Sequence, residues 1–363
     1  MNLENGSLLK VTDLTVKYKS AVKEITALHR VNLSIEPSQI VAVVGESGCG
    51  KSTLGLSIIR LLQKPPAEIV SGQIFFKDND LLKLSDKQMA GLRGTDISMI
   101  FQEPMSSLDP VYTVGTQMHE AIEVREKRKA ARDYGPFTRA NPQLAKGTQG
   151  GLPRLLGVQL PSSRREFTYS GETVDVLEKV QIADPERVLN KYPHELSGGM
   201  VQRVMIAQAL VEKPSLLLAD EPTSAVDVTI QAQVLRLMLD LRNEIHSSIL
   251  LITHDLAVAA QVADRIAVMY AGEVVELSDV RELFNKPLHP YTEGLLKSLP
   301  RKYRDEGWLE AIPGDVPDLK SPPSGCRFDP RCPYAFERCH TEHPELVEPE
   351  PKRKVACFLR YPA

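Results

Sequence analysis

A glycine-rich stretch near the start of the chain has the residue types that bind phosphate. It matches the pattern G-x-x-x-x-G-K-[ST] and consists of Gly45, Glu46, Ser47, Gly48, Cys49, Gly50, Lys51, Ser52 and Thr53. Glycines let backbone N–H groups turn toward an anion, and a helix N-terminus adds the positive end of a dipole. We therefore expect a nucleotide site in which Lys51 reaches the β- and γ-phosphates and Ser52 binds Mg²⁺, with Thr53 beside it on the phosphates. The alternative is a chance glycine-rich turn.

Two acidic residues follow an apolar run in the second half of the chain. Asp220 and Glu221 come directly after Leu216, Leu217, Leu218 and Ala219. Ligands of open α/β sheets bind at the carboxyl ends of the strands. We expect Asp220 to hold Mg²⁺, directly or through water, and Glu221 to polarise the attacking water. A strand that ends at a solvated acidic turn would look the same.

A third stretch, Ser197-Gly198-Gly199, precedes a helical pattern. A helix N-terminus of this kind suits a γ-phosphate. Serine and glycine are also ordinary helix caps, so the stretch alone does not decide between the two.

The elements that would position these residues alternate along the chain. Apolar strands are expected at residues 40–44, 97–104, 214–222 and 248–255, a helix at 231–246 and a hairpin at 264–277 with Gly272 at its turn. An opening sheet is expected over residues 8–36. This alternation predicts an α/β core with a parallel sheet. Beyond residue 285 the chain is rich in proline and has little regular pattern.

Length and composition limit the function classes. The chain has 363 residues, a net charge of −3 and 42% hydrophobic residues, which is ordinary for a soluble globular protein of about two domains. A nucleic-acid binder would be expected to carry a basic stripe. No window approaches the ~18–20 apolar residues of a membrane span, and the N-terminus lacks an apolar signal core. We therefore expect any membrane role to come through a partner.

In order and spacing these motifs resemble those of ATP-binding cassette (ABC) ATPases over roughly residues 8–280. The signature Leu196-Ser197-Gly198-Gly199 is followed by Gln202-Arg203. The resemblance implies that Gln102 contacts Mg²⁺ or the water, that His254 donates to the γ-phosphate, and that Tyr18 stacks on adenine. It also implies that two cassettes sandwich two ATP molecules head to tail, with the signature completing the site of the other subunit. The segment 224–227 would lie at that dimer interface.

Further stretches resemble the oligopeptide/dipeptide importer branch, and most closely its D-type ATPase. They are FQEPMSSLDP at 101–110, KYPHELSGGM at 191–200, DEPTSAVDVTIQAQVL at 220–235, KPLHPYTEGLLKSLP at 286–300 and CRFDPRCPYAFERC at 326–339. The resemblance implies a heterodimer with an F-type ATPase subunit, two transmembrane permease subunits and an external substrate-binding protein. The subunit would be peripheral on the cytoplasmic face of the membrane. Related systems import nickel or oligosaccharides.

The implied fold is a RecA-like P-loop NTPase core with an antiparallel β subdomain, an inserted α-helical subdomain and a small cysteine-containing tail. We expect core segments at 1–103 and 201–284, the helical subdomain at 104–200 and the tail at 285–363. Residues 134–172, which are rich in Gly, Pro, Ser and Arg, depart from the family pattern. They are expected to be a tolerated surface insertion or a contact with a partner.

Four cysteines cluster in the tail, at Cys326, Cys332, Cys339 and Cys357. A disulfide is unexpected in a cytosolic ATPase. Zinc sites usually contain close cysteine pairs, whereas wider spacing permits a [4Fe–4S] cluster. The resemblance favours the cluster as a structural element, with zinc or free thiols as alternatives.

Two other function classes remain at this point. A soluble cassette ATPase that acts on nucleic acid or ribosomes would usually carry two cassettes or a long coiled coil, and this chain shows neither. A redox sensor would need a spectral change of the cluster that is linked to activity. The expected function is therefore a transport motor that uses ATP and Mg²⁺.

Overall fold

The computed structural model describes residues 6–19, 24–103, 107–125, 171–211, 213–224, 228–299 and 311–360. Contacts divide the chain into two compact units. The first unit combines Met1–Gln102 with Lys213–Ala363, and the second is Glu103–Glu212.

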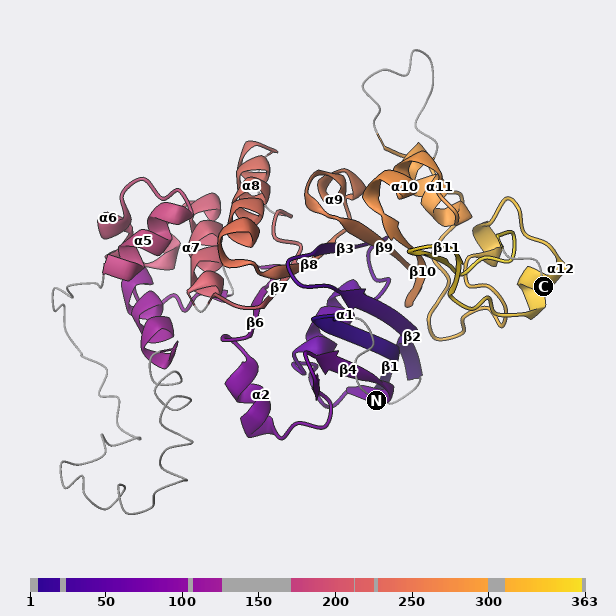
Figure 1. The fold of residues 1–363 in the computed structure, drawn as a ribbon, viewed down its shortest axis with the longest axis horizontal. Helices are drawn as coiled ribbons and strands as arrows, with labels where there is room; N and C mark the ends of the chain where they lie inside the picture. Colours follow the sequence, from indigo (N-terminus) through magenta and orange to yellow (C-terminus); the bar gives the residue numbers. More distant parts are fainter. Residues whose placement is uncertain are drawn as a thin grey trace, which may run out of the picture. The chain divides into compact units, whose positions relative to one another are not determined.

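The first unit is built on a sheet of eight strands (Figure 1), in the order β11-β12-β10-β9-β3-β8-β7-β6. Neighbouring strands from β9 to β6 pair in parallel. Their bounds are β9 Arg265–Tyr270, β3 Ile40–Val44, β8 Ser248–Thr253, β7 Leu216–Asp220 and β6 Ile97–Ile100. Every residue of β3, β7 and β8 is buried. The short apolar runs of the sequence are therefore the interior strands of a sheet that is covered on both faces.

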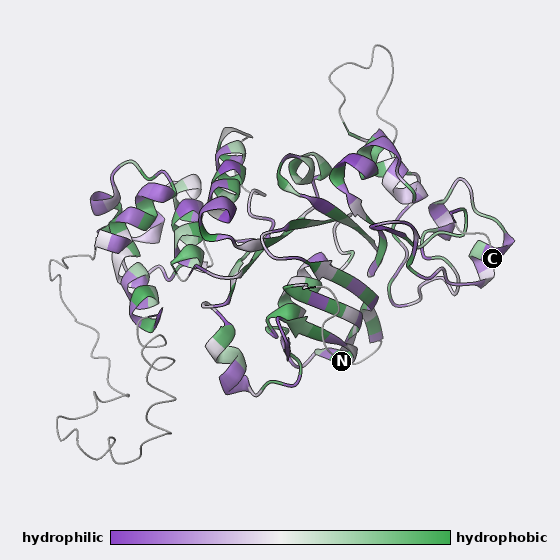
Figure 2. Cartoon of the chain, in the orientation of Figure 1, coloured by the Kyte–Doolittle hydropathy of each residue, from purple (hydrophilic) through white to green (hydrophobic). Residues whose placement is uncertain are grey.

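A second sheet packs in the same unit, with strand order β2-β1-β4-β5. The strands are β2 Glu24–Ile35, β1 Leu9–Lys19, β4 Ala67–Phe76 and β5 Asn79–Asp80, and all pairs are antiparallel. Its strands mix hydrophobic and hydrophilic residues (Figure 2), as expected for a sheet with one face in water. Leu14 of β1, Ile58 of the first helix and Val43 of β3 belong to one buried cluster. One core therefore joins the two sheets.

Seven α-helices of the first unit accompany these sheets in the described ranges. They are α1 Lys51–Ile58, α2 Asp86–Leu92, α8 Val228–Ile245, α9 Leu256–Val262, α10 Val280–Asn285, α11 Pro290–Lys297 and α12 Glu337–Thr341. Ser85 and Gln88 form a capping box at α2, and Asp255 accepts from the backbone N–H groups of Ala257 and Val258 at α9. Helix ends are thus fixed by the polar residues that precede them.

The second unit is helical in its described part. Residues 114–125 form a helix, followed by α5 Gly171–Lys179, α6 Pro185–Leu189, the 3₁₀ turn η2 Pro193–Glu195 and α7 Gly198–Leu210. The Arg125 guanidinium pairs with Glu172 and donates to the carbonyl of Val211 at 2.9 Å. The predicted subdomain boundary at residue 200 falls inside α7. Of the predicted insertion 134–172, residues 134–170 lie outside the described ranges.

The C-terminal segment, which is the predicted tail at 285–363, contains more helices and strands than its sequence indicated. It contains α11, η3 Asp329–Arg331, α12 Glu337–Thr341, β11 Val347–Glu350 and β12 Arg353–Val355. Val355 of β12 pairs with Glu276 of β10 (Glu273–Asp279), so the segment extends the large sheet. Its elements have three to eight residues, too few to show a clear hydrophobic period.

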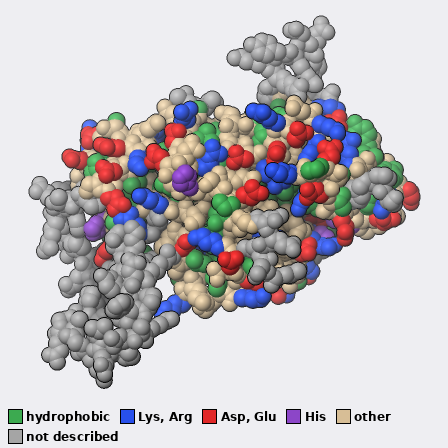
Figure 3. Space-filling view, in the orientation of Figure 1, with side chains coloured by type: hydrophobic (Ala, Val, Ile, Leu, Met, Phe, Trp, Pro, Cys, Tyr) green, Lys and Arg blue, Asp and Glu red, His purple; other side chains and the backbone are tan. Residues whose placement is uncertain are grey.

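No helix among the described residues is long and apolar enough to cross a bilayer. On the face of the molecule in Figure 3, the basic and acidic side chains of the described residues are interspersed.

Candidate nucleotide site

The phosphate loop connects β3 to the first turn of α1. Gly50 precedes the helix with φ 103°, a conformation that favours glycine. A Cβ on Gly45 would lie 2.1 Å from the carbonyl oxygen of Met269, and one on Gly50 would lie 2.6 Å from that of Ala27. These two glycines are therefore required by the close approach of neighbouring strands.

The Lys51 side chain is buried and turns back into the loop. Its ammonium donates to the carbonyl oxygens of Gly45 at 2.8 Å and Glu46 at 3.0 Å, and it lies 3.8 Å from the sulfur of Cys49. Burial raises the pKa of the Cys49 thiol. The loop thus surrounds a positive charge, as a site for phosphate requires.

Ser52 and Asp220 meet at the end of the sheet. The Ser52 hydroxyl donates to Oδ1 of Asp220 at 3.1 Å. Burial raises the pKa of Asp220, although the hydrogen bond from Ser52 opposes the shift; the nearby charge of Glu221 adds to it. A buried carboxylate beside a hydroxyl is a pair of oxygen ligands that fits Mg²⁺, whose charge would offset the cost of burial.

Glu221 lies between the two other predicted side chains of the site. Its Oε2 accepts from Nε2 of Gln102 at 3.2 Å, and its Oε1 lies 3.2 Å from Nδ1 of His254. The side chain of Glu221 is 15% exposed and that of His254 is 60% exposed. Glu221 has φ 46°, which is unusual for a residue other than glycine. The structure thus brings Gln102, Glu221 and His254 together, and the side-chain amide of Gln102 donates to the carboxylate of Glu221.

Tyr18 also lies at this end of the molecule. Its hydroxyl is 3.4 Å from Oγ1 of Thr53, the residue that follows the phosphate loop motif. The first strand therefore places an aromatic ring next to the loop.

The signature residues Ser197, Gly198 and Gly199 belong to the second unit. Ser197 caps α7, and its hydroxyl accepts from the backbone N–H of Met200 at 3.4 Å. A Cβ at Gly198 would meet nothing within 4 Å. Residues 225–227, which were predicted to lie at a dimer interface, are outside the described ranges.

The C-terminal segment contacts the phosphate loop, which the sequence did not predict. Arg331 donates to both carboxylate oxygens of Glu46, at 2.9 and 3.2 Å, and to the hydroxyl of Tyr270 at 3.3 Å. The backbone N–H of Glu46 donates to the hydroxyl of Tyr291 at 3.1 Å. Arg331 is separated from Glu46 by 285 residues. No local pattern marks such a pair.

The four tail cysteines lie around one small space, together with His289 and Phe328. All four are free thiols. Burial raises the pKa of Cys326 to about 12 and that of Cys332 to about 11. The space between them is about 10 Å³, roughly what one water molecule needs. Among the described residues, the groups whose ligand atoms all lie within 4.8 Å of one another include no three of these thiols, so they do not form a closed zinc site.

Two family models match the chain. One, described as ABC transporter, matches residues 28–224, and the other, described as oligopeptide/dipeptide transporter C-terminal region, matches residues 275–339. A probable peptide ABC transporter ATP-binding protein of Sinorhizobium fredii is 44% identical over 97% of this chain and 94% of its own length. The dipeptide transport ATP-binding protein DppD of Escherichia coli is 42% identical over 94% of this chain and 93% of its own length.

A solved structure of similar fold is the ATP-binding cassette MJ0796, described as a dimer in a post-hydrolysis state bound to ADP and Pi. It is 27% identical with a TM-score of 0.56, over 75% of this chain and 99% of its own.

These comparisons contradict the predicted [4Fe–4S] cluster. The family models and the relatives are described by ATP binding and peptide transport, and none is described as an iron–sulfur protein. In the described part of the chain Cys326, Cys332, Cys339 and Cys357 line one pocket, but no three of their sulfur atoms all lie within 4.8 Å of one another. The wide cysteine spacing permitted a cluster but did not require one.

Proposed function

This chain belongs to the ABC transporter family of ATP-hydrolysing cassettes, and from that premise we propose that it powers the import of di- or oligopeptides. The observation that carries the proposal is the resemblance over the whole chain. Relatives named for peptide transport align with 94–97% of it, and the tail matches the oligopeptide/dipeptide transporter region. The tail lies outside the cassette match, so its agreement is a second, separate support.

The ATP phosphates would lie on the phosphate loop. Lys51 leaves the carbonyl oxygens of Gly45 and Glu46 for the β- and γ-phosphates, because a phosphate is the stronger acceptor for an ammonium group. Ser52 and Asp220 would hold Mg²⁺, with Gln102 as a third contact. When bound, Mg²⁺ neutralises the charge that develops on the phosphates during transfer. Tyr18 would stack on adenine.

Hydrolysis would use Glu221 as the general base for the attacking water. Gln102 and His254 each contact one oxygen of its carboxylate, and this fixes the direction in which the carboxylate faces. Their polar hydrogens can turn from Glu221 to the water and to the γ-phosphate when ATP is bound. The positive φ of Glu221 supports this assignment, because strained backbone is retained mainly where function requires it.

A second subunit would complete the site. Ser197 and the amides of Gly198 and Gly199 lie at the N-terminus of a 13-residue helix, where a γ-phosphate is favoured. We propose that they contact the ATP held by the partner's phosphate loop, in a heterodimer with an F-type ATPase. The solved cassette of similar fold is described as a dimer with ADP and Pi.

The dimer would sit beneath two transmembrane permease subunits, on the cytoplasmic face of the membrane, with an external binding protein supplying the peptide. We assign residues 1–102 and 213–284 to a RecA-like core with its antiparallel β subdomain. Residues 103–212 would be the helical subdomain that contacts the permeases, because α7 continues past the predicted boundary at residue 200, and 285–363 would be a tail domain.

The tail would also act on the nucleotide site. Arg331 is buried, and its forked pair of bonds fixes the Glu46 side chain of the phosphate loop. Tyr291 fixes the backbone of the same residue. Arg331 is thus a positioning residue for ATP binding.

The experiment is reconstitution of the complete complex in liposomes with its binding protein. We expect a dipeptide or oligopeptide to stimulate ATP hydrolysis and to accumulate in an ATP-dependent way, and the Glu221→Gln variant to abolish both. Stimulation by nickel or an oligosaccharide, with no response to peptides, would contradict the proposed cargo. Failure to assemble with any permease would contradict the transport role itself.

A further inference from the structure

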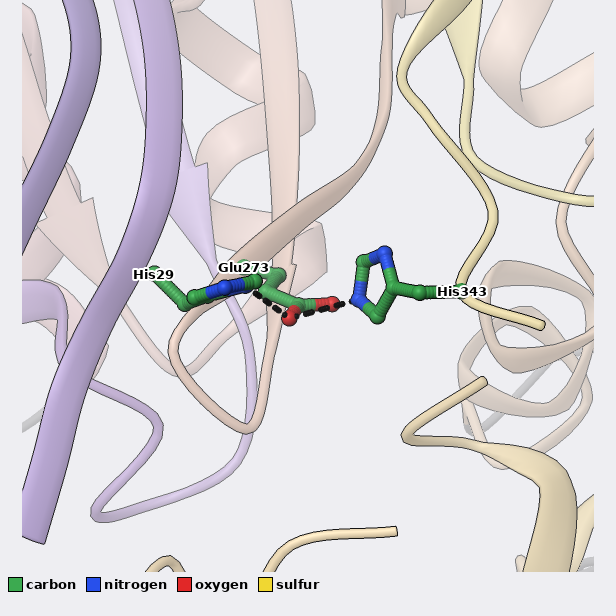
Figure 4. Close-up of side chains that lie close together, drawn as sticks. All are labelled: His29, Glu273 and His343. Atoms are coloured by element: carbon green, nitrogen blue, oxygen red, sulfur yellow. Dashed lines mark hydrogen bonds and ion pairs between the residues drawn. The ribbon is translucent and has the colours of Figure 1, made fainter. Parts of the chain in front are cut away.

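Two histidines from distant parts of the chain converge on one carboxylate (Figure 4). His29 lies on β2, Glu273 begins β10, and His343 follows α12 in the C-terminal segment. Nδ1 of His29 and Nε2 of His343 each lie 2.8 Å from Oε1 of Glu273. One ligand atom from each residue lies within 4.8 Å of the other two. Two imidazoles and one carboxylate suit a divalent transition metal, and the same donor types hold zinc in open sites.

The three side chains of this site differ in how far they are exposed. Glu273 is nearly buried, and the side chains of His29 and His343 are 32% and 31% exposed. Both imidazoles therefore remain accessible to an ion in solution.

A cavity beside the three residues leaves room for a further ligand. It has a volume of about 160 Å³ and is also lined by Asp13, Asn32 and Glu345. This volume holds several water molecules. A metal bound by three protein ligands could thus keep one or more waters, as open zinc sites do.

Arg327 sets a limit on the strength of such a site. Its Nε lies 2.7 Å from the same Oε1, so its positive charge opposes a second cation. A carboxylate has two oxygens, and one can pair with Arg327 while the other binds the metal. We therefore expect an exchangeable ion, held more weakly than in a closed structural zinc site.

We propose that His29, Glu273 and His343 bind a divalent transition-metal ion, with Zn²⁺ as the probe, and that this ion fastens the C-terminal segment to β2 and β10. The site shares no residue with the nucleotide site. Its occupancy therefore does not depend on the proposed ATPase mechanism or on the cargo.

The first test identifies the ligands in the full-length chain by titration with Co²⁺. Nitrogen and oxygen ligands give weak visible bands, whereas thiolates add intense sulfur-to-metal charge transfer in the near ultraviolet. We expect only the weak bands. Strong charge-transfer bands would place the metal on the tail cysteines and would overturn the proposal.

The second test uses matched variants and Zn²⁺ competition with a chromogenic chelator. His29→Asn and His343→Asn should each weaken Zn²⁺ binding at least about tenfold, because each removes a direct ligand. The control is His340→Asn, since His340 belongs to the same segment but pairs with Asp329 at 2.8 Å; it should bind Zn²⁺ as the unaltered protein does. Zn²⁺ should also raise the Tm of the control and not that of the two ligand variants.

Folding is checked by the metal-free Tm and by ATP binding. The two ligand variants lie on different segments, so each supplies an independent test if the other fails to fold. Equal Zn²⁺ affinity in all variants, or no Zn²⁺ bound at millimolar concentration, would overturn the proposal.

Discussion

The ion pair between Arg331 and Glu46 makes the C-terminal segment part of the ATP site, and Arg331→Ala tests this. The substitution removes two bonds to the Glu46 carboxylate, at 2.9 and 3.2 Å. It also removes the bonds to the Tyr270 hydroxyl at 3.3 Å and to the carbonyls of Pro313 at 2.9 Å and Ile312 at 3.4 Å. Hydrogen bonds to charged groups contribute about 1.5–3 kcal/mol each. These bonds share one guanidinium and Glu46 is 28% exposed, so water replaces part of the loss and the net cost is that of about one such bond rather than of their sum. We expect the free energy of unfolding to fall by about 2 kcal/mol.

ATP binding should weaken as well, because the loop loses the contact that fixes Glu46. In the variant, part of the binding free energy of ATP is used to order the loop. If this part is about half of the 2 kcal/mol, the Kd for ATP rises about fivefold. The assay is isothermal titration with ATP and Mg²⁺ in the Glu221→Gln background, which prevents turnover. Arg331→Lys keeps the charge but loses the forked geometry, so its affinity for ATP should lie between those of the unaltered protein and Arg331→Ala.

The matched control is Arg338→Ala. Arg338 lies in the same segment and pairs with Glu342 at 2.8 Å, away from the loop, so ATP affinity should not change. If Arg331→Ala lowers stability but leaves ATP affinity at the unaltered value, the contact is structural only, and the positioning role is refuted.

Three further predictions follow from the site and its surroundings. Glu221→Gln should keep ATP affinity but lower turnover by about 10²–10⁴-fold, the usual contribution of a general base; turnover near the unaltered rate would remove that assignment. Lys51→Ala should weaken ATP binding, measured by titration, and unchanged affinity would argue against the phosphate loop assignment. Burial lowers the pKa of His289 to about 3, from 6.5 in the unfolded chain, so the neutral ring favours folding above pH 6.5 and its contribution is lost as pH falls toward 3. Between pH 6.5 and 5 the titration of this group alone should lower the free energy of unfolding by about 2 kcal/mol. The asparagine of His289→Asn can still accept from the N–H of Tyr291 but does not titrate, so this variant should show a shallower pH dependence of stability in denaturant melts.

Much of the nucleotide site could be predicted from the sequence because its parts follow short buried strands. The strands that end just before Gly45, at Asp220 and just before His254 have five or six residues and are buried throughout, and parallel strands bring their carboxyl ends to one edge. The contact between Gln102 and Glu221 follows from the same geometry.

What could not be predicted depends on long-range packing of short elements. Arg331 and His343 lie in a segment whose strands and helices are too short for periodicity, and their partners are far away in the sequence. The prediction of a [4Fe–4S] cluster from the cysteine spacing was wrong for a related reason, since spacing along the sequence does not reveal how closely buried side chains pack.

A structure of the Glu221→Gln complex trapped with ATP and Mg²⁺ would show whether ATP is held by the phosphate loop of one subunit and its site is completed by the signature residues of the other. We predict that Ser197 and the amides of Gly198 and Gly199 lie within hydrogen-bond distance of a γ-phosphate whose other side contacts the partner's phosphate-loop lysine. A closed complex in which these three residues lie far from every bound nucleotide would contradict a site shared between two subunits.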